Sequence, residues 1–423
     1  MERSEYAYRG SSTKKNRRYS DAERQYPNSG RRYSDTERKY SDSGRRYSDN
    51  RPTKRMTYTR QYDFVLFFLT IGIALFGVVM IYSAGAYTAA LKNNPFRYVK
   101  TQLFCLLLGT FGMLVVSLFD YQVLMQNIFR TKITLISVLY VAAMFLQGIV
   151  LVIGEEYNGA KRWLKIGSLQ FQPSEISKIA AILFIAYAVY QRRRDLDSIA
   201  GFIRILIYMS PLIGLILLEN LSSAIIVSGI TFGMCFVASK KKGYFLLIIL
   251  AAGAGLAAVL LLGEGFRIER VMIWLDVENH PKAFQIRQGL YAISSGGLFG
   301  KGLGQSMQKL GFIPEAYNDM IFSVICEELG VVGAFLVILA FLALFWRIVV
   351  VACHAPDLFG TMLCVGVMIQ LAIQVIINIA VVTNSMPSTG IPLPLVSYGG
   401  TSAIIIMVEM GLVLGVSRQI KQK

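Results

Sequence analysis

The side chain with the clearest capacity for chemistry in this sequence is Asp319. It stands where a polar, glycine-rich stretch beginning at Phe284 meets an apolar run long enough to cross a bilayer. A carboxylate that is partly removed from water has a raised pKa, which makes it a better proton acceptor near neutral pH. We therefore look for chemistry first at Asp319, with Glu315 as a second acidic group beside it.

The glycine-rich stretch before Asp319 is expected to be non-helical. Its glycine spacing is superficially similar to a dinucleotide-binding loop, but no βαβ unit surrounds it, so we reject that function. Glycines here are expected to permit tight turns of the backbone near a ligand. The stretch also carries Arg287, Lys301 and Lys309, which are candidates to meet an anionic group.

A helix beginning near Asn318 would place positions 319, 323 and 327 on one face. The sequence therefore predicts a polar stripe of Asp319, Ser323 and Glu327 on an otherwise apolar helix, with Glu328 outside it. A polar stripe at membrane depth usually faces a cavity or a partner helix.

A second group of polar side chains lies between residues 154 and 178. Pro173 suits the first turn of a helix, which places Glu175 near the positive end of the helix dipole and Lys178 one turn further on. This pair is either a mutually satisfied structural pair or the polar wall of a water-filled cavity. Arg162 and Trp163 nearby are either an interfacial anchor or a contact to a phosphate.

A third polar segment spans residues 384–402. Its prolines and glycines exclude a regular helix. Irregular backbone near a membrane persists only where it is buried in protein or faces water. Its hydroxyl groups, among them Ser397 and Tyr398, are candidate ligand contacts, and none of them is a general base.

The elements that must position these residues are apolar helices. The chain is 54% hydrophobic and 16% charged, whereas soluble domains carry roughly a quarter charged residues. Runs of about 20 apolar residues predict membrane helices. The fold class we predict is therefore an all-α polytopic membrane protein with irregular outer-face loops. The ten predicted spans are 64–84, 99–119, 131–153, 174–190, 203–218, 221–239, 244–263, 319–346, 358–383 and 401–417.

The distribution of cations predicts the orientation, because Lys and Arg accumulate on the cytoplasmic side. The net charge of +17 is explained by this topology and does not require a nucleic-acid partner. We expect both termini in the cytoplasm and the loops 154–173, 264–318 and 384–400 together on the outer face. Cations of the inner side are Arg130, Lys132, Arg192–Arg194, Lys240–Lys242, Arg347, Arg418, Lys421 and Lys423.

Residues 1–60 form a separate region in this prediction. They are basic, poor in aliphatic side chains and repeat the motif RRYSD from Arg17, Arg31 and Arg45. Such a unit buries no core, so we expect a disordered cytoplasmic tail, with residues 61–423 as the membrane domain. The tail is either a solvated basic segment or a tether to anionic lipid or an acidic partner.

No metal-ligand spacing is visible among the five cysteines and two histidines. We expect the cysteines to be small buried hydrophobic residues. A protein-held metal is therefore not predicted.

The motifs GAKRW, QPSEISK, SSGGLFGKGLGQSMQK, PEAYND, EELG and TGIPLPLVSYGGTS resemble the SEDS family (shape, elongation, division and sporulation). The resemblance runs from about residue 62 to the C-terminus. It implies a ten-helix peptidoglycan glycosyltransferase that polymerises lipid II in the bacterial cytoplasmic membrane. The implied partners are a class B penicillin-binding protein that cross-links the product, other division proteins and membrane lipid.

The resemblance also assigns residues. The essential aspartate of the family falls on Asp319, and the acid and base of its central cavity fall on Glu175 and Lys178. The family's histidine before the aspartate is replaced here by Tyr317-Asn318, so no role of that imidazole transfers. The motif Pro314-Glu315-Ala316 favours the division branch of the family over the elongation branch. The expected substrate contacts are Arg162, Trp163, Glu175, Lys178, Gln285, Gln288, Lys309, Glu315, Ser397 and Tyr398.

The reaction that the resemblance implies joins a sugar hydroxyl to an anomeric carbon and expels a lipid diphosphate. Asp319 is the candidate general base that accepts the proton of this hydroxyl. The leaving diphosphate needs positive charge or a metal, so a divalent cation (Mg²⁺ or Mn²⁺) is left open. The alternatives are a lipid II flippase and a noncatalytic scaffold for the partner synthase, because polar groups and a proline-broken segment also suit transporters.

Overall fold

The computed structural model describes residues 62–128, 133–157, 160–166, 169–250 and 266–420 of the 423-residue chain. The predicted disordered tail, residues 1–60, lies outside these ranges. The predicted span 244–263 lies largely outside them, although residues 243–250 are helical.

Within the described ranges, nine helices are long and apolar enough to cross a bilayer. Helices suit this setting because they satisfy every backbone polar group internally. The nearly all-helical membrane fold predicted from the sequence is confirmed. The spanning helices are α1 (Phe64–Leu91), α2 (Arg97–Leu118), α3 (Leu135–Ile153), α4 (Pro173–Arg192), α5 (Ile199–Glu219), α6 (Leu221–Ala238), α10 (Ile321–His354), α11 (Leu358–Val382) and α12 (Gly400–Arg418).

Local sequence signals determine several helix ends. The Asp63 carboxylate accepts the backbone N–H of Leu66 at 3.0 Å and caps α1. Pro173 occupies the first turn of α4, as predicted. Asn220 alone separates α5 from α6, and its side chain accepts the N–H of Ser223 at 3.0 Å. The two helices are therefore joined by a tight connection.

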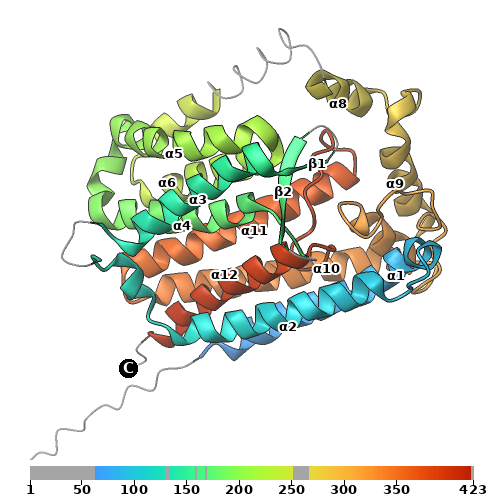
Figure 1. Cartoon of the computed structure of the whole chain (residues 1–423), viewed down its shortest axis with the longest axis horizontal. Helices are drawn as coiled ribbons and strands as arrows, with labels where there is room; N and C mark the ends of the chain where they lie inside the picture. The colour runs from blue at the N-terminus through green and yellow to red at the C-terminus, as the bar shows by residue number, and fades with distance from the viewer. Residues whose placement is uncertain (1–61, 129–132, 158–159, 167–168, 251–265, 421–423) are drawn as a thin grey trace, which may run out of the picture. The chain divides into compact units, whose positions relative to one another are not determined.

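The helices lie side by side, and α12 runs along α2 (Figure 1). Small residues allow this close approach: a Cβ added to Gly411 of α12 would lie 2.6 Å from the carbonyl oxygen of Met113 on α2. The connecting segments that carry the predicted site residues gather at the end of the helices opposite to the C-terminus (Figure 1).

These connecting segments contain regular structure that the sequence analysis did not predict. The first forms an antiparallel sheet in the order β1-β2-β3. The stretch from Phe284, expected to be non-helical, begins with helix α9, because Ile286, Gly289 and Ala292 recur at helical spacing and are buried together. The elements are β1 (Glu155–Tyr157), β2 (Ala160–Ile166), β3 (Leu169–Phe171), α8 (Phe266–Leu275) and α9 (Phe284–Ser295), with short 3₁₀ turns at η1 (Tyr121–Met125), η2 (Arg193–Asp197) and η3 (Pro281–Ala283).

Helix α10 is broken at Gly330, where φ is 68° and ψ is −168°. Only glycine adopts this conformation without strain. The glycine-rich segment 296–311 folds back against the break: the N–H groups of Lys301 and Gly302 donate to the carbonyl oxygens of Glu327 and Glu328, each at 2.9 Å. The break therefore anchors the segment that leads to Asp319.

Candidate active site around Asp319

Asp319 lies in the turn directly before α10 and not on the helix, because α10 begins at Ile321. The predicted stripe of Asp319, Ser323 and Glu327 is therefore wrong. Ser323 and Glu327 are fully buried within α10. The Glu327 carboxylate faces the glycine-rich segment, where Lys301 Nζ lies 2.7 Å from it.

Three separate segments meet at Asp319. Gln285 of α9 donates from Nε2 to Asp319 Oδ1 at 3.4 Å. Asn378 of α11 donates from Nδ2 to the main-chain oxygen of Asp319 at 2.8 Å. A Cβ added to Gly390 would lie 3.9 Å from Asp319 Oδ2, so the proline-rich segment passes beside the carboxylate. Two of the three polar loops, 264–318 and 384–400, therefore meet at Asp319.

Burial, together with the smaller effect of the negative charge of Glu315, raises the pKa of the half-buried Asp319 carboxyl from 3.8 to about 6. Hydrogen bonds from backbone N–H groups and the positive charge of Arg270 partly oppose this shift. A pKa near 6 leaves the carboxylate largely ionised at neutral pH, yet makes it a stronger proton acceptor than a solvated aspartate. Asp319 is thus suited to general base catalysis.

Arg270 is a site residue that the sequence analysis missed. It lies on α8, where Nη1 donates to the carbonyl oxygen of Ser388 at 3.1 Å. Its charge acts on both Asp319 and Arg162. Arg270 precedes Asp319 by 49 residues, and no local spacing connects the two, so only the folded structure identifies it.

Arg162, a predicted substrate contact, belongs to the same region. Its Nε donates to the carbonyl oxygen of Glu219 at the end of α5, at 2.7 Å. Burial lowers the pKa of Arg162, and the nearby charge of Arg270 lowers it further, while Glu219 raises it. Two guanidinium groups within electrostatic reach of each other form an environment that favours an anion. Trp163 follows Arg162 on β2 and is half-buried.

The tyrosine that replaces the expected histidine is part of an aromatic cluster. Tyr317 Oη donates to Tyr98 Oη at 3.0 Å, and the two ring centroids are 4.2 Å apart. The Tyr398 ring packs edge-on against both rings, and its backbone N–H donates to the carbonyl oxygen of Tyr317 at 2.9 Å. Tyr398 therefore joins the proline-rich segment to the Asp319 turn.

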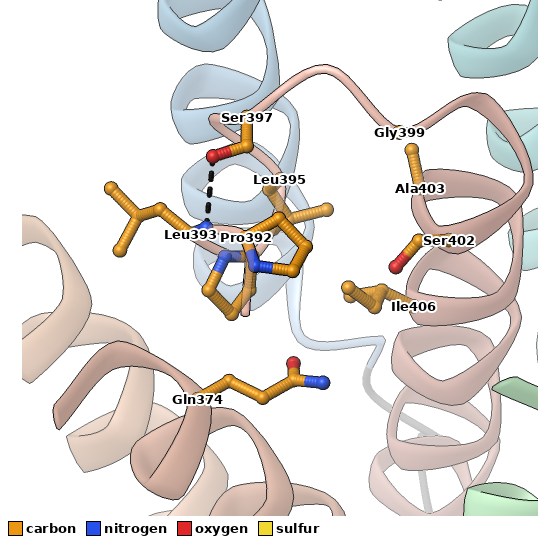
Figure 2. A pocket seen from close by; sticks show the side chains of 10 residues that line it. Gln374, Pro392, Leu393, Leu395, Ser397, Gly399, Ser402, Ala403 and Ile406 are labelled. Carbon is orange, nitrogen blue, oxygen red and sulfur yellow. Dashed lines mark hydrogen bonds between the residues drawn. The ribbon is translucent and has the colours of Figure 1, made fainter. Parts of the chain in front are cut away.

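Ser397 lies in the turn of the proline-rich segment (Figure 2). The backbone N–H of Leu393 donates to Ser397 Oγ at 2.8 Å, so this hydroxyl closes the turn. Beneath the turn is a cavity of about 10 Å³, which Gln374 of α11 and Ser402 of α12 also line. This volume matches a single water molecule and not a sugar.

Glu175 and Lys178 form the predicted pair, with Lys178 Nζ 2.8 Å from Glu175 Oε1, and both side chains are buried. Ser402 Oγ donates to Glu175 Oε2 at 2.8 Å. Glu409 on α12 lies within electrostatic reach of both groups, and Gln370 Nε2 donates to its two oxygens at 2.8 and 2.7 Å. These residues form a buried polar cluster among α4, α11 and α12, separate from the contacts of Asp319.

Lys309 was expected to contact the substrate, but its side chain is buried. It is 5% exposed, and its Nζ lies 2.7 Å from Glu328 Oε1 and donates to Ser83 Oγ at 2.9 Å. Lys301 is paired with Glu327, and Arg287 donates to the carbonyl oxygen of Val277 at 3.5 Å. The three cations expected to meet an anion are thus bonded within the fold. Of these, Lys301 and Lys309 hold the segments around the break in α10.

The remaining predicted contacts occupy the rim of the site. Glu315 is exposed, adopts φ of 48° and accepts Asn318 Nδ2 at 2.8 Å. Gln288 is half-buried on α9, one turn beyond Gln285. Within the described ranges, no group of three His, Cys, Asp or Glu side chains is arranged to hold a metal ion.

A bundle of apolar helices with a partly buried carboxylate at one end defines an integral membrane protein with a candidate active site. The chain belongs to the cell cycle protein family of FtsW, RodA and SpoVE, whose model matches residues 63–422. The family resemblance derived from the motifs is confirmed.

Individual relatives support the same assignment. Stage V sporulation protein E of Bacillus subtilis is 36% identical over 84% of this chain and 97% of its own length. The probable peptidoglycan glycosyltransferase FtsW of Trichlorobacter lovleyi is 34% identical over 85% of this chain and 94% of its own length.

Solved structures share the fold. A chain from a peptidoglycan synthase complex that coordinates polymerization and crosslinking superposes with a TM-score of 0.71 at 29% identity, covering 86% of this chain and 99% of that chain. The rod shape determining protein RodA of Thermus thermophilus gives a TM-score of 0.62 at 30% identity, covering 86% and 98%.

Proposed function

We propose that this chain is a peptidoglycan glycosyltransferase that polymerises lipid II into glycan strands. Relatives that it matches along most of their length carry this activity in their names. The structural observation that carries the proposal is the carboxylate of Asp319. It is half-buried, bonded to Gln285 and held by Asn378 at the end of the membrane helices, where a lipid-linked sugar can reach it.

In the proposed step, the 4-hydroxyl oxygen of one sugar attacks the anomeric carbon of another. The O–H proton passes to the Asp319 carboxylate while the new C–O bond forms. The bond from the anomeric carbon to the diphosphate oxygen breaks, and the electron pair leaves with the lipid diphosphate. A single displacement inverts the anomeric centre. Asp319 then releases its proton to solvent.

Arg270 and Arg162 are the cations that we assign to the leaving diphosphate. Both guanidinium groups are oriented by backbone carbonyls, so they are fixed before the substrate arrives. Preorganised positive charge at a developing anion is often the largest single contribution to catalysis. Lys309 has no part in this step because Glu328 neutralises it.

A divalent cation would enter with the substrate's diphosphate, since the described side chains form no metal-ligand cluster. No step of the proposed reaction is assigned to it. Removal of divalent cations with EDTA, followed by readdition of Mg²⁺ or Mn²⁺, measures its contribution.

The test is polymerisation of purified lipid II by the full chain together with its class B penicillin-binding protein. Asp319→Asn should lower the rate by about 10²- to 10⁴-fold, the usual contribution of a general base. Glu278→Gln makes the same chemical change at an exposed carboxylate of the same segment and should retain wild-type activity.

Three outcomes would contradict the proposal. Equal polymerisation by wild type and a folded Asp319→Asn variant would remove Asp319 from catalysis. Transfer of lipid II across liposome membranes without polymerisation would establish the flippase instead. A complex that assembles normally with neither activity would support the scaffold.

We further propose that the protein works in division, at the outer face of the bacterial cytoplasmic membrane, with both termini in the cytoplasm. Arg192 and Lys240 lie at the ends of α4 and α6 opposite to Asp319, which agrees with the excess of cations on cytoplasmic loops. Reaction of a single cysteine at exposed Glu278 with a membrane-impermeant thiol reagent in intact spheroplasts tests the orientation.

A further inference from the structure

Asn378 makes a contact that the proposed reaction does not yet use. It lies on α11 and is 1% exposed. Its Nδ2 donates to two main-chain oxygens, those of Asp319 and Ile391, each at 2.8 Å. A side-chain amide has two N–H groups, so each acceptor receives one of them. One buried amide thus joins the Asp319 turn to the proline-rich segment.

The proline-rich segment forms a wall beside the Asp319 carboxylate. Gly390, the residue before Ile391, has φ of 68°, and a Cβ built on it would lie 3.9 Å from Asp319 Oδ2. The outer side of this wall is also held, because Ser222 Oγ donates to the carbonyl oxygen of Thr389 at 2.6 Å. Movement of Ile391 would therefore move the wall relative to the carboxylate.

We propose that Asn378 is a positioning residue that fixes the Asp319 turn against the proline-rich segment and so sets how closely the base is enclosed. The inference deepens the proposed function, on which it rests. Asn378 does not touch the reacting atoms. It acts through the main chain of the residue that does.

The shape of the asparagine suits this role. Leucine has nearly the same size but no N–H group, so both carbonyl oxygens would lose their buried donor. Aspartate has the same shape but presents oxygens to two carbonyl oxygens, which repel it. Asn378 Oδ1 is buried and has no hydrogen-bond partner among the described residues. The two Nδ2 bonds are therefore the hydrogen bonds through which this side chain joins the two segments.

Enclosure by the wall contributes to the removal of Asp319 from water. The charged groups that act on this carboxyl are Glu315, which raises its pKa, and Arg270, which lowers it; the tyrosines Tyr317 and Tyr398 nearby are neutral. Neither charged group lies on α11. If loss of the Asn378 bonds opens the wall, water enters and the pKa of Asp319 falls from about 6 towards 3.8.

The experiment uses the full chain in complex with its class B partner and measures kcat and KM for lipid II across pH 5 to 8. Asn378→Leu and Asn378→Asp should lower kcat by about 10- to 10²-fold, as expected for misplacement of a catalytic group by up to about 1 Å. KM should change by less than about threefold. In Asn378→Leu the acidic limb of the kcat profile should move to lower pH by about one unit. In Asn378→Asp the new carboxylate opposes this shift, because a nearby negative charge raises the pKa of Asp319.

Gln147→Leu is the matched control. Gln147 is a buried amide on α3, away from the Asp319 turn, so its removal tests the general effect of deleting a buried amide in this bundle. It should leave the acidic limb in place. Gly390→Ala disturbs the same wall from the other side and should shift the limb in the same direction as Asn378→Leu.

The inference is overturned if folded Asn378→Leu and Gly390→Ala variants retain the wild-type kcat and acidic limb. It is also overturned if kcat falls in Asn378→Leu while the limb stays at the wild-type pH, because that pattern describes only lost stability. These results are distinct from failure of the proposed function, which would appear as polymerisation that does not depend on Asp319.

Discussion

Replacing Asp319 with asparagine should stabilise the folded protein at neutral pH while it lowers the rate of polymerisation by about 10²- to 10⁴-fold. The folded state raises the pKa of this carboxyl from 3.8 to about 6. Between these values the folded protein holds a proton that the unfolded chain has released. Because the folded state binds more protons there, its stability falls as the pH rises through this window.

The size of the stability gain follows from the pKa shift of Asp319. A difference of about two pKa units corresponds to about 3 kcal/mol, since each unit is about 1.4 kcal/mol. Asparagine keeps the shape of the side chain and can accept the same backbone N–H groups, but it has no charge to bury. Solvent at this half-buried site weakens the effect, so we expect a gain of about 1–3 kcal/mol above pH 6.

The assay is thermal or denaturant unfolding of wild type and Asp319→Asn in the same detergent, at pH 7.5 and at pH 4. The variant should be more stable than wild type at pH 7.5, and the difference should nearly disappear at pH 4, where wild-type Asp319 is protonated. The reasoning would be refuted by a variant that is less stable at pH 7.5, or by a difference that does not depend on pH.

Three further predictions concern the same region. Wild-type polymerisation should rise with pH through a midpoint of about 6, because Asp319 must be ionised to accept a proton; a midpoint below 5 in initial-rate measurements would contradict this. Lys309→Met should cost about 3–5 kcal/mol by leaving Glu328 unpaired, and the double variant with Glu328→Gln should recover part of the loss in unfolding experiments. Gly330→Ala should destabilise the protein by at least about 2 kcal/mol, because φ is 68° and the added Cβ would lie 2.4 Å from backbone atoms; an unchanged unfolding midpoint would show that the break can relax.

The helices and their ends could largely be predicted from the sequence, because bilayer thickness and backbone hydrogen bonding are local constraints. Pro173 indicated a helix boundary through its own chemistry. Helix α9 was missed because it is short and lies in a stretch whose glycines suggested turns. Its helical form depends on burial of Ile286 against other parts of the chain.

The candidate site was predicted only in part. Asp319 stood out because a carboxylate is costly beside an apolar helix. The partner of Lys309 could not be predicted, since a residue type gives the sign of a charge but not its neighbour in the fold. Arg270 and Asn378 act on Asp319 through contacts between segments far apart in sequence, so they became visible only with the tertiary structure.

Two ion pairs lie at the break in α10, Lys301 with Glu327 and Lys309 with Glu328. They also affect how the chain is inserted into the membrane. Lys301 precedes Glu327 by 26 residues, and Lys309 precedes Glu328 by 19. During synthesis, each lysine leaves the ribosome shortly before the glutamate that neutralises it. The segment can therefore enter the bilayer with its charges already paired, and Ser83 of α1, inserted much earlier, completes the bonding of Glu328 when α10 arrives. Biogenesis then requires no step in which either glutamate crosses hydrocarbon alone.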